Sequence, residues 1–235
     1  ANVLAPGMIA ALFSQGNFNQ FGGQATVANT LPLSTVMNGV QVLFNGAPVP
    51  LFYADPNQIN FQVPATAPQS GLADLLVKGT ATGRILGDTT VLMTPSLPGI
   101  FTQAGNGSGA AAALNEDNTV NSQTNPAVQG SVITLFGTGQ GFIPGAPADG
   151  SALSGPFPYP NPPIVIMGTD FVDPANIKYF GLAPTEVGVW QLNLVIPKTV
   201  ITLPSNPTQV VIVLNSIASG GGGIGRSVIV YVKQR

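Results

Sequence analysis

Nine carboxylates are the side chains from which acid–base or metal chemistry would have to be built in this sequence. It contains no His and no Cys, which excludes an imidazole base, a thiolate nucleophile and the usual zinc ligands. A glycosidase needs two carboxyl groups that face each other across a bond, roughly 5–9.5 Å apart. The carboxylates are Asp55, Asp74, Asp88, Glu116, Asp117, Asp149, Asp170, Asp173 and Glu186. They are dispersed, and their spacing does not predict such a pair.

Glu116 and Asp117 are adjacent, and on an extended strand neighbouring side chains point to opposite faces. Because Asn115 and Asn118 flank them, they favour a polar hairpin turn. A calcium loop is the alternative, since backbone carbonyls could complete the about six to eight oxygens that calcium takes. The spacing does not require that loop.

The remaining acids and glycines also indicate turns. Asp55 and Asp173 each precede a proline and predict the start of a turn. The glycine-rich residues 105–109 and 220–223 have no Lys and no helical pattern after them, so they predict flexible turns rather than phosphate loops. No Gly-x-Ser-x-Gly elbow accompanies a base. We therefore expect no catalytic residue, no metal ion and no organic cofactor.

One proline-rich segment carries aromatic rings. Phe157 and Tyr159 lie within residues 156–163, which the prolines hold extended. The segment either folds over its own domain, forms a sugar-stacking platform, or docks to another subunit, so both residues are candidate subunit contacts. Asn106 begins the only N-x-S/T sequon and is a candidate glycosylation site.

The composition describes a folded, nearly uncharged chain. Charged residues make up 7% of its 235 residues, with a formal net charge of −2, whereas about 25% is typical. Seven basic residues are too few for a nucleic-acid footprint, and 44% hydrophobic residues argue against disorder. No apolar run approaches the roughly 18 residues of a membrane helix. The sequence begins with Ala and shows no secretion leader, so we expect a mature or trimmed form; the composition favours an extracellular or cell-surface protein.

Strand patterns dominate the chain. Short segments rich in Val, Ile, Leu and Phe alternate with Gly, Pro or Asn roughly every 8–15 residues, as in an all-β sandwich or barrel. We expect strands at residues 8–13, 40–44, 51–53, 58–63, 73–78 and 89–93. A second set is expected at residues 131–136, 164–167, 176–180, 189–196, 209–214 and 227–232.

The two sets of strands repeat one another. Gln58-Ile-Asn-Phe-Gln-Val-Pro64 corresponds to Gln191-Leu-Asn-Leu-Val-Ile-Pro197, and residues 5–13 correspond to 128–136. A period of about 125 residues indicates a tandem domain duplication. We predict one β-sandwich over residues 1–104 and another over 105–235, joined near 103–109. The expected core residues are Phe13, Leu43, Phe61, Phe136, Ile166, Trp190 and Leu194.

Three motifs resemble immunoglobulin-like domains of the IPT/TIG type: PG-x-I/V-x-x-L-F-x-x-G, V-x-V-x-F-N-G-x-P-x-P-L-x-Y and Q-I-N-F-Q-V-P. With residues 97–102, 113–121 and 125–127, the whole chain resembles the uncharacterised C-terminal domain of secreted acidobacterial (Solibacter-type) proteins. The resemblance implies a tandem pair of extracellular immunoglobulin-like β-sandwiches. It implies no known activity.

Two hypotheses for function follow. The first is a non-catalytic structural protein that associates with itself in a fibre, sheath or surface layer, which a net charge near zero favours. The second is a carbohydrate- or protein-binding accessory module of a secreted enzyme or adhesin. The second predicts an exposed, planar row of aromatic side chains on a sheet face.

The start of each repeat suggests how copies would join. Residues 110–120 form a predicted hairpin before the second repeat, whereas only residues 1–4 precede the first. The first sandwich should therefore lack a strand, and an unpaired edge invites a strand from another chain. Residues 2–12 or 227–232 are the expected donors, in a head-to-tail contact that would propagate as a filament. A missing upstream segment or an internal cover are the alternatives. The corresponding candidate contacts are Val3, Leu4, Ile9, Val228, Ile229 and Val230.

Overall fold

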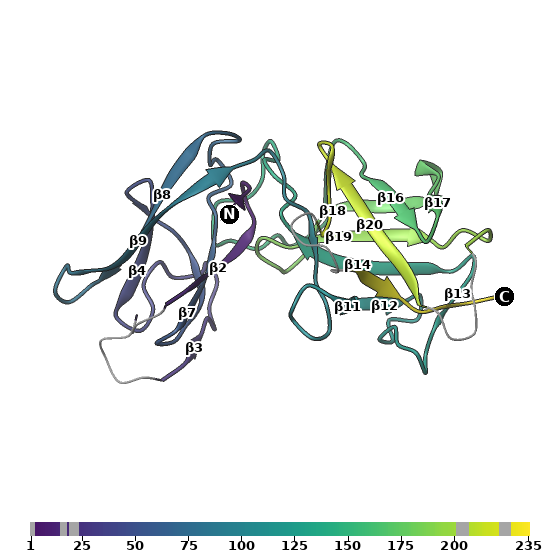
Figure 1. Ribbon diagram of the computed structural model, residues 1–235, viewed down its shortest axis with the longest axis horizontal. Helices are drawn as coiled ribbons and strands as arrows, with labels where there is room; N and C mark the ends of the chain where they lie inside the picture. Colours follow the sequence, from purple (N-terminus) through teal and green to yellow (C-terminus); the bar gives the residue numbers. More distant parts are fainter. Residues whose placement is uncertain (1–2, 15–17, 19–23, 201–206, 221–226) are drawn as a thin grey trace. The chain divides into compact units, whose positions relative to one another are not determined.

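A computed structural model describes residues 3–14, 18, 24–200, 207–220 and 227–235. Within these residues the chain is built from short β-strands and one 3-10 helix, η1 (Pro174–Asn176), with no α-helix (Figure 1). The predicted all-β sandwich fold is confirmed. Asn2 of the first predicted donor strand and most of the glycine-rich stretch 220–223 lie outside the described residues.

The chain divides into two compact units. Unit 1 contains residues 1–96, 139–155 and 184–188, and unit 2 contains residues 97–138, 156–183 and 189–235. The predicted boundary at residue 104 therefore differs from the observed division. It differs because β10 (Gly99–Ile100) pairs with a strand of unit 2, and because two later loops belong to unit 1.

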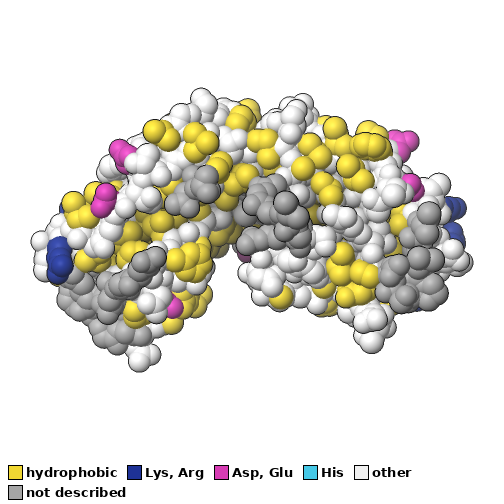
Figure 2. Space-filling model, viewed as in Figure 1, with side chains coloured by type: hydrophobic (Ala, Val, Ile, Leu, Met, Phe, Trp, Pro, Cys, Tyr) yellow, Lys and Arg dark blue, Asp and Glu magenta, His cyan; other side chains and the backbone are white. Residues whose placement is uncertain are grey.

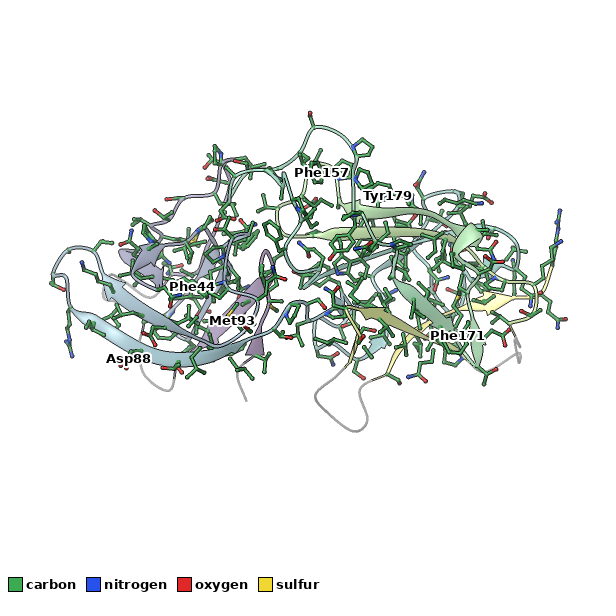
Figure 3. All side chains as sticks on the ribbon, turned by 90° about the horizontal axis from the view of Figure 1, so that it is seen from above. Phe44, Asp88, Met93, Phe157, Phe171 and Tyr179 are labelled. Atoms are coloured by element: carbon green, nitrogen blue, oxygen red, sulfur yellow. The ribbon has the colours of Figure 1, made fainter. Side chains whose placement is uncertain are left out.

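Unit 1 is a sandwich of two sheets. One sheet has the order β1-β9-β8-β4-β5 and the other the order β2-β7-β6-β3. The strands are β1 (Val3–Leu4), β2 (Ile9–Phe13), β3 (Thr26–Val27), β4 (Val40–Phe44), β5 (Ala47–Pro48), β6 (Leu51–Ala54), β7 (Gln58–Gln62), β8 (Leu72–Gly79) and β9 (Ile85–Met93). Side chains from both sheets form one apolar core, in which Phe44 and Met93 lie (Figure 3).

Unit 2 repeats this arrangement. Its sheets have the orders β11-β22-β20-β16-β17 and β10-β14-β19-β18-β15, with β12 also on β14 and β21 on β20, while β13 pairs with β23. The strands are β11 (Gly109–Ala110), β12 (Ala113–Asn115), β13 (Ala127–Val128), β14 (Val132–Thr138), β15 (Phe157–Pro158), β16 (Ile164–Met167), β17 (Asp170–Phe171), β18 (Ile177–Leu182), β19 (Trp190–Val195), β20 (Thr208–Leu214), β21 (Ile217–Ala218), β22 (Val228–Val230) and β23 (Val232–Lys233). The sheet β11-β22-β20-β16-β17 of unit 2 corresponds strand for strand to the sheet β1-β9-β8-β4-β5 of unit 1. In both units a two-residue strand runs parallel to its neighbour: β1 to β9, and β11 to β22.

The core residues were predicted only in part. Phe61, Trp190 and Leu194 are fully buried, as expected. Phe13 is 73% exposed, however, because β2 turns Ala10 and Leu12 inward and Phe13 outward. Leu43, Phe136 and Ile166 are likewise only half-buried, since their strands point the alternate residues into the core.

The later loops complete unit 1 with specific hydrogen bonds. The N–H of Gly150 donates to Gln62 Oε1 (2.6 Å), and the N–H of Ala65 donates to a carboxylate oxygen of Asp149 (2.9 Å). The N–H of Leu33 donates to the carbonyl of Gly150 (2.8 Å). These bonds satisfy the buried amide of Gln62 and cover one end of the outer face of the β2-β7-β6-β3 sheet.

Candidate functional site

A groove of about 750 Å³, lined by both apolar and polar residues, runs along one side of unit 1, between β2 and β9. On the face drawn in Figure 2, hydrophobic side chains gather where Figure 1 places these two strands. Leu12 and Leu86 are half-buried in its walls, and Leu75, Val77 and Val91 lie at its base. All of the lining residues belong to unit 1.

Among the described residues, each strand that flanks the groove has backbone groups on its outer edge that no strand pairs with. The N–H of Val63 bonds the carbonyl of Met8, and the N–H of Ser14 bonds the carbonyl of Asn57, so the antiparallel alternation turns the backbone groups of Ala11 and Phe13 away from β7. On β9, the same alternation turns those of Asp88 and Thr90 away from β8. In the part of the chain that the structure describes, no strand pairs with these groups.

The equivalent edge of unit 2 is covered. β12 pairs antiparallel with β14 through Ala113–Asn115, and the N–H of Phe101, just after β10, donates to the carbonyl of Phe136 (2.9 Å). Phe136 corresponds to Phe13. The side chains of Ala111 and Ala113 are 2% exposed and join the core between the two sheets.

A buried asparagine holds this cover in place. Asn121 Nδ2 donates to Asn115 Oδ1 (3.0 Å) and to the carbonyl of Tyr231 (2.8 Å). Its Oδ1 accepts the N–H of the same Tyr231 (2.8 Å). The side chain thus bonds both backbone groups of Tyr231, between β22 and β23, as a neighbouring strand would, and ties them to the hairpin.

A difference in length accounts for the two edges. Residues 5–8 alone separate β1 from β2, whereas residues 111–131, which include β12 and β13, separate β11 from β14. The prediction that the first sandwich lacks a strand is confirmed for the described residues.

The predicted strand donors are not free, and this corrects the expectation. Within residues 2–12, β1 pairs with β9 and β2 with β7; within 227–232, β22 pairs with β11 and β20. The side chains of Leu4, Val228 and Val230 are buried in their own units, and Ile229 is half-buried. Val3, Leu4 and Ile9 line the groove, so they belong to its acceptor side.

The aromatic, proline-rich segment folds over its own unit. Phe157–Pro158 forms β15 against β18, the N–H of Tyr159 donates to the carbonyl of Phe180 (2.9 Å), and the two rings meet edge to face at 5.6 Å. The first of its three interpretations is therefore confirmed. Asn106 is exposed in a tight turn, where its Oδ1 accepts the N–H of Ser108 (3.0 Å).

The carboxylates serve as turn acceptors. Asp117 accepts both the hydroxyl and the N–H of Thr119, which holds the pKa of its carboxyl below the ordinary value and confirms the predicted hairpin turn. Asp55 accepts the Tyr53 hydroxyl (2.7 Å) and the N–H groups of Asn57 and Gln58; the Tyr53 bond is the main cause of its lowered pKa. Asp173 caps η1. Among the described residues, no three carboxylates come together as a metal site would require.

Comparisons with known proteins show only distant likenesses. No protein family and no curated protein matches the chain. One similar solved structure is SGBP-B of the Bacteroides ovatus mixed-linkage glucan utilization locus, in complex with a mixed-linkage heptasaccharide (14% identity, TM-score 0.38). The match covers 99% of this chain but 44% of that one, so the chain spans less than half of its length. Another is the N-terminal Ig1-2 module of the Drosophila receptor protein tyrosine phosphatase DLAR (11% identity, 99% and 94% covered, TM-score 0.23).

No helix in the described residues has the length and apolar character needed to cross a bilayer.

Proposed function

We propose that this protein is a non-catalytic, extracellular assembly module, whose first sandwich accepts a β-strand from another polypeptide. The observation that carries the proposal is the difference between the two edges. Among the described residues, no strand pairs with the backbone groups of Ala11 and Phe13, while those of their counterparts Thr134 and Phe136 are bonded. Strand addition to an open edge supplies main-chain hydrogen bonds, and side-chain pockets supply selectivity.

Unit 2 indicates the chemistry of the occupant. There the covering segment sends two small apolar side chains, Ala111 and Ala113, between the sheets, two residues apart. The groove of unit 1 has the same apolar base, in Leu75, Val77 and Val91. The proposed occupant is therefore an extended, uncharged segment of a second polypeptide with small apolar residues at alternate positions.

The surface supports an assembly role. With few charged side chains to repel a neighbour, association is not opposed by net charge. Charged groups are also sparse on the face drawn in Figure 2.

The test uses a fluorescent peptide that copies residues 109–115, Gly-Ala-Ala-Ala-Ala-Leu-Asn. We expect saturable binding to the whole protein by fluorescence anisotropy. Ala11→Pro should abolish it, because proline removes an edge N–H that is not part of the β2-β7 ladder. Ala11→Ser is the matched control and should bind the peptide as the parent does.

A second variant acts on the groove itself. A Cβ at Gly87 meets Phe18 at an ordinary contact distance of 3.5 Å, so Gly87→Val narrows the groove with little strain and should also abolish binding. A peptide with Asp at the two positions that copy Ala111 and Ala113 should not bind. Absence of binding, or equal binding to the parent, Ala11→Pro and Gly87→Val, would contradict strand acceptance.

A further inference from the structure

The same four side chains occur at equivalent outward positions of both units. In unit 1, Phe13 lies opposite Gln58, and Tyr53 lies opposite Asn60. In unit 2, the equivalent positions hold Phe136, Gln191, Tyr179 and Asn193, with the same cross-strand partners. We call these residues the first and the second aromatic–amide set.

The two sets also share their geometry. Gln58 Nε2 donates to Asn60 Oδ1 at 2.7 Å, and Gln191 Nε2 donates to Asn193 Oδ1 at 2.9 Å. A bulge precedes the tyrosine in both β6 and β18, so that each tyrosine shares the outer face with its asparagine.

Packing against the core does not explain this identity. The inward neighbours of the two sets differ: Ile59 corresponds to Leu192, Phe61 to Leu194 and Ala54 to Phe180. The set residues are themselves exposed or half-buried on the outer face. The two sets therefore agree although the interior side chains beside them differ.

The tyrosine rings lie along the sheet rather than away from it. The Tyr53 hydroxyl bonds Asp55, two residues further along, and the Tyr179 hydroxyl donates to the carbonyl of Leu182 (2.6 Å). A Cβ on Gly181 would lie 2.7 Å from the Tyr179 hydroxyl, so glycine leaves room for the ring. The same hydroxyl accepts the N–H of Phe157 (3.1 Å), beside which Tyr179 lies in Figure 3.

We propose that each aromatic–amide set is a binding site for a neutral oligosaccharide. The Gln–Asn bond uses one donor and one acceptor, and leaves Gln Oε1 and Asn Nδ2 without a described protein partner as an acceptor and a donor side by side. Vicinal sugar hydroxyls, which both donate and accept, match that pair. The apolar C–H face of a sugar ring matches the aromatic rings, of which Phe13 is 73% exposed. None of the eight side chains carries a charge, which favours a neutral sugar over an anionic one.

The proposal does not rest on strand acceptance, although Phe13 also lines the groove. Calorimetric titration with cellohexaose, xylohexaose and mannohexaose tests it. We expect at least one hexasaccharide to bind with two sites per chain. Asn60→Ala or Asn193→Ala should each remove one site, and the double variant should weaken binding by about tenfold or more. Phe13→Ala, at an exposed position, should weaken the first site without affecting folding.

The controls are two glutamines on the sheets that do not carry the sets, Gln41 on β4 in unit 1 and Gln209 on β20 in unit 2. Gln41→Ala, Gln209→Ala and the groove variant Gly87→Val should all bind sugar as the parent does. The proposal is wrong if no neutral hexasaccharide binds, if hexagalacturonate binds equally well, or if Asn60→Ala and Asn193→Ala leave the number of sites unchanged. A single site that only one of these substitutions removes would overturn the equivalence of the two sets.

Discussion

Unit 1 and unit 2 share an order of strands but differ at the edge where each sandwich begins. In unit 2, β10 and β12 cover β14, and Ala111 and Ala113 fill the space between the sheets. In unit 1, the described residues place no strand on the outer edge of β2, and a groove remains. The comparison shows that the segments around two equivalent strands, rather than the strands themselves, determine how an edge of the sandwich is covered. Under the proposed function, the duplicated fold contains one unit that covers this edge itself and one that accepts a partner strand.

The largest expected effect comes from placing a charge within the cover of unit 2. Ala113→Asp puts a carboxylate into the core, and an uncompensated buried charge lowers the free energy of unfolding by about 3–5 kcal/mol. Trp190 is the only tryptophan, so urea unfolding followed by its fluorescence reports on unit 2. Leu114→Asp, at the half-exposed neighbour that faces the other way, is the control. Equal midpoints for both variants would show that β12 is not part of the core.

A smaller effect is expected from the asparagine that ties the hairpin to the end of the chain. Asn121→Ala leaves the N–H of Tyr231 without its side-chain partner, while the carbonyl of Tyr231 keeps its bond from the N–H of Ala127. We expect a loss of about 1–3 kcal/mol from unit 2. The same fluorescence measurement applies. Glu116→Ala, at an exposed position of the hairpin, should change the midpoint little. A similarly small shift for Asn121→Ala would mean that the cover is held by other contacts.

The smallest effect is on stability at low pH, and a different carboxylate is responsible for it in each unit. Hydrogen bonds from Tyr53 to Asp55 and from Thr119 to Asp117 lower the folded-state pKa of each carboxyl. Each bond therefore stabilises its unit above the ordinary carboxyl pKa of about 4, and this contribution is lost as the pH falls through the folded-state value. Asp55→Asn should flatten the acid limb of unit 1, measured by calorimetry between pH 2 and pH 6. Asp117→Asn should flatten that of unit 2, measured by Trp190 fluorescence. An unchanged acid limb in either variant would remove that carboxyl from the explanation.

Some of the fold follows from local patterns. The strands at 40–44 and 164–167 were predicted with their observed bounds, because apolar alternation ends there at clear turn residues. The orientation of β2 was not, because Ile9–Phe13 is apolar on both faces and a period of two cannot select the inward one. The N-terminal part of β9 also lacks a pattern: Gly87 and Asp88 become strand residues through pairing with β8.

The candidate sites could likewise be predicted from the sequence only in part. The missing strand of the first sandwich could be predicted, because aligning the repeats exposes the short connection at residues 5–8. The groove walls could not, since Leu86 and Phe18 lie outside the predicted strands and meet only in three dimensions. Nor could the aromatic–amide sets be assembled from sequence, although Q-x-N recurs in both repeats. The cross-strand register is what places Phe13 beside Gln58 and Tyr53 beside Asn60.

The loops that complete unit 1 are synthesised after its strands, and this sets the order in which the unit can fold. A ribosome releases the chain from its N-terminus, so β2 and β7 emerge long before residues 139–155 and 184–188, which belong to the same unit. Gln62 has no Gly150 to bond until β14 has been made, and residue 188 follows β16 and β18. The first half of the chain therefore cannot finish folding as it is synthesised. Its maturation waits for most of the second half, and a fragment ending at residue 104 would remain permanently at that unfinished stage.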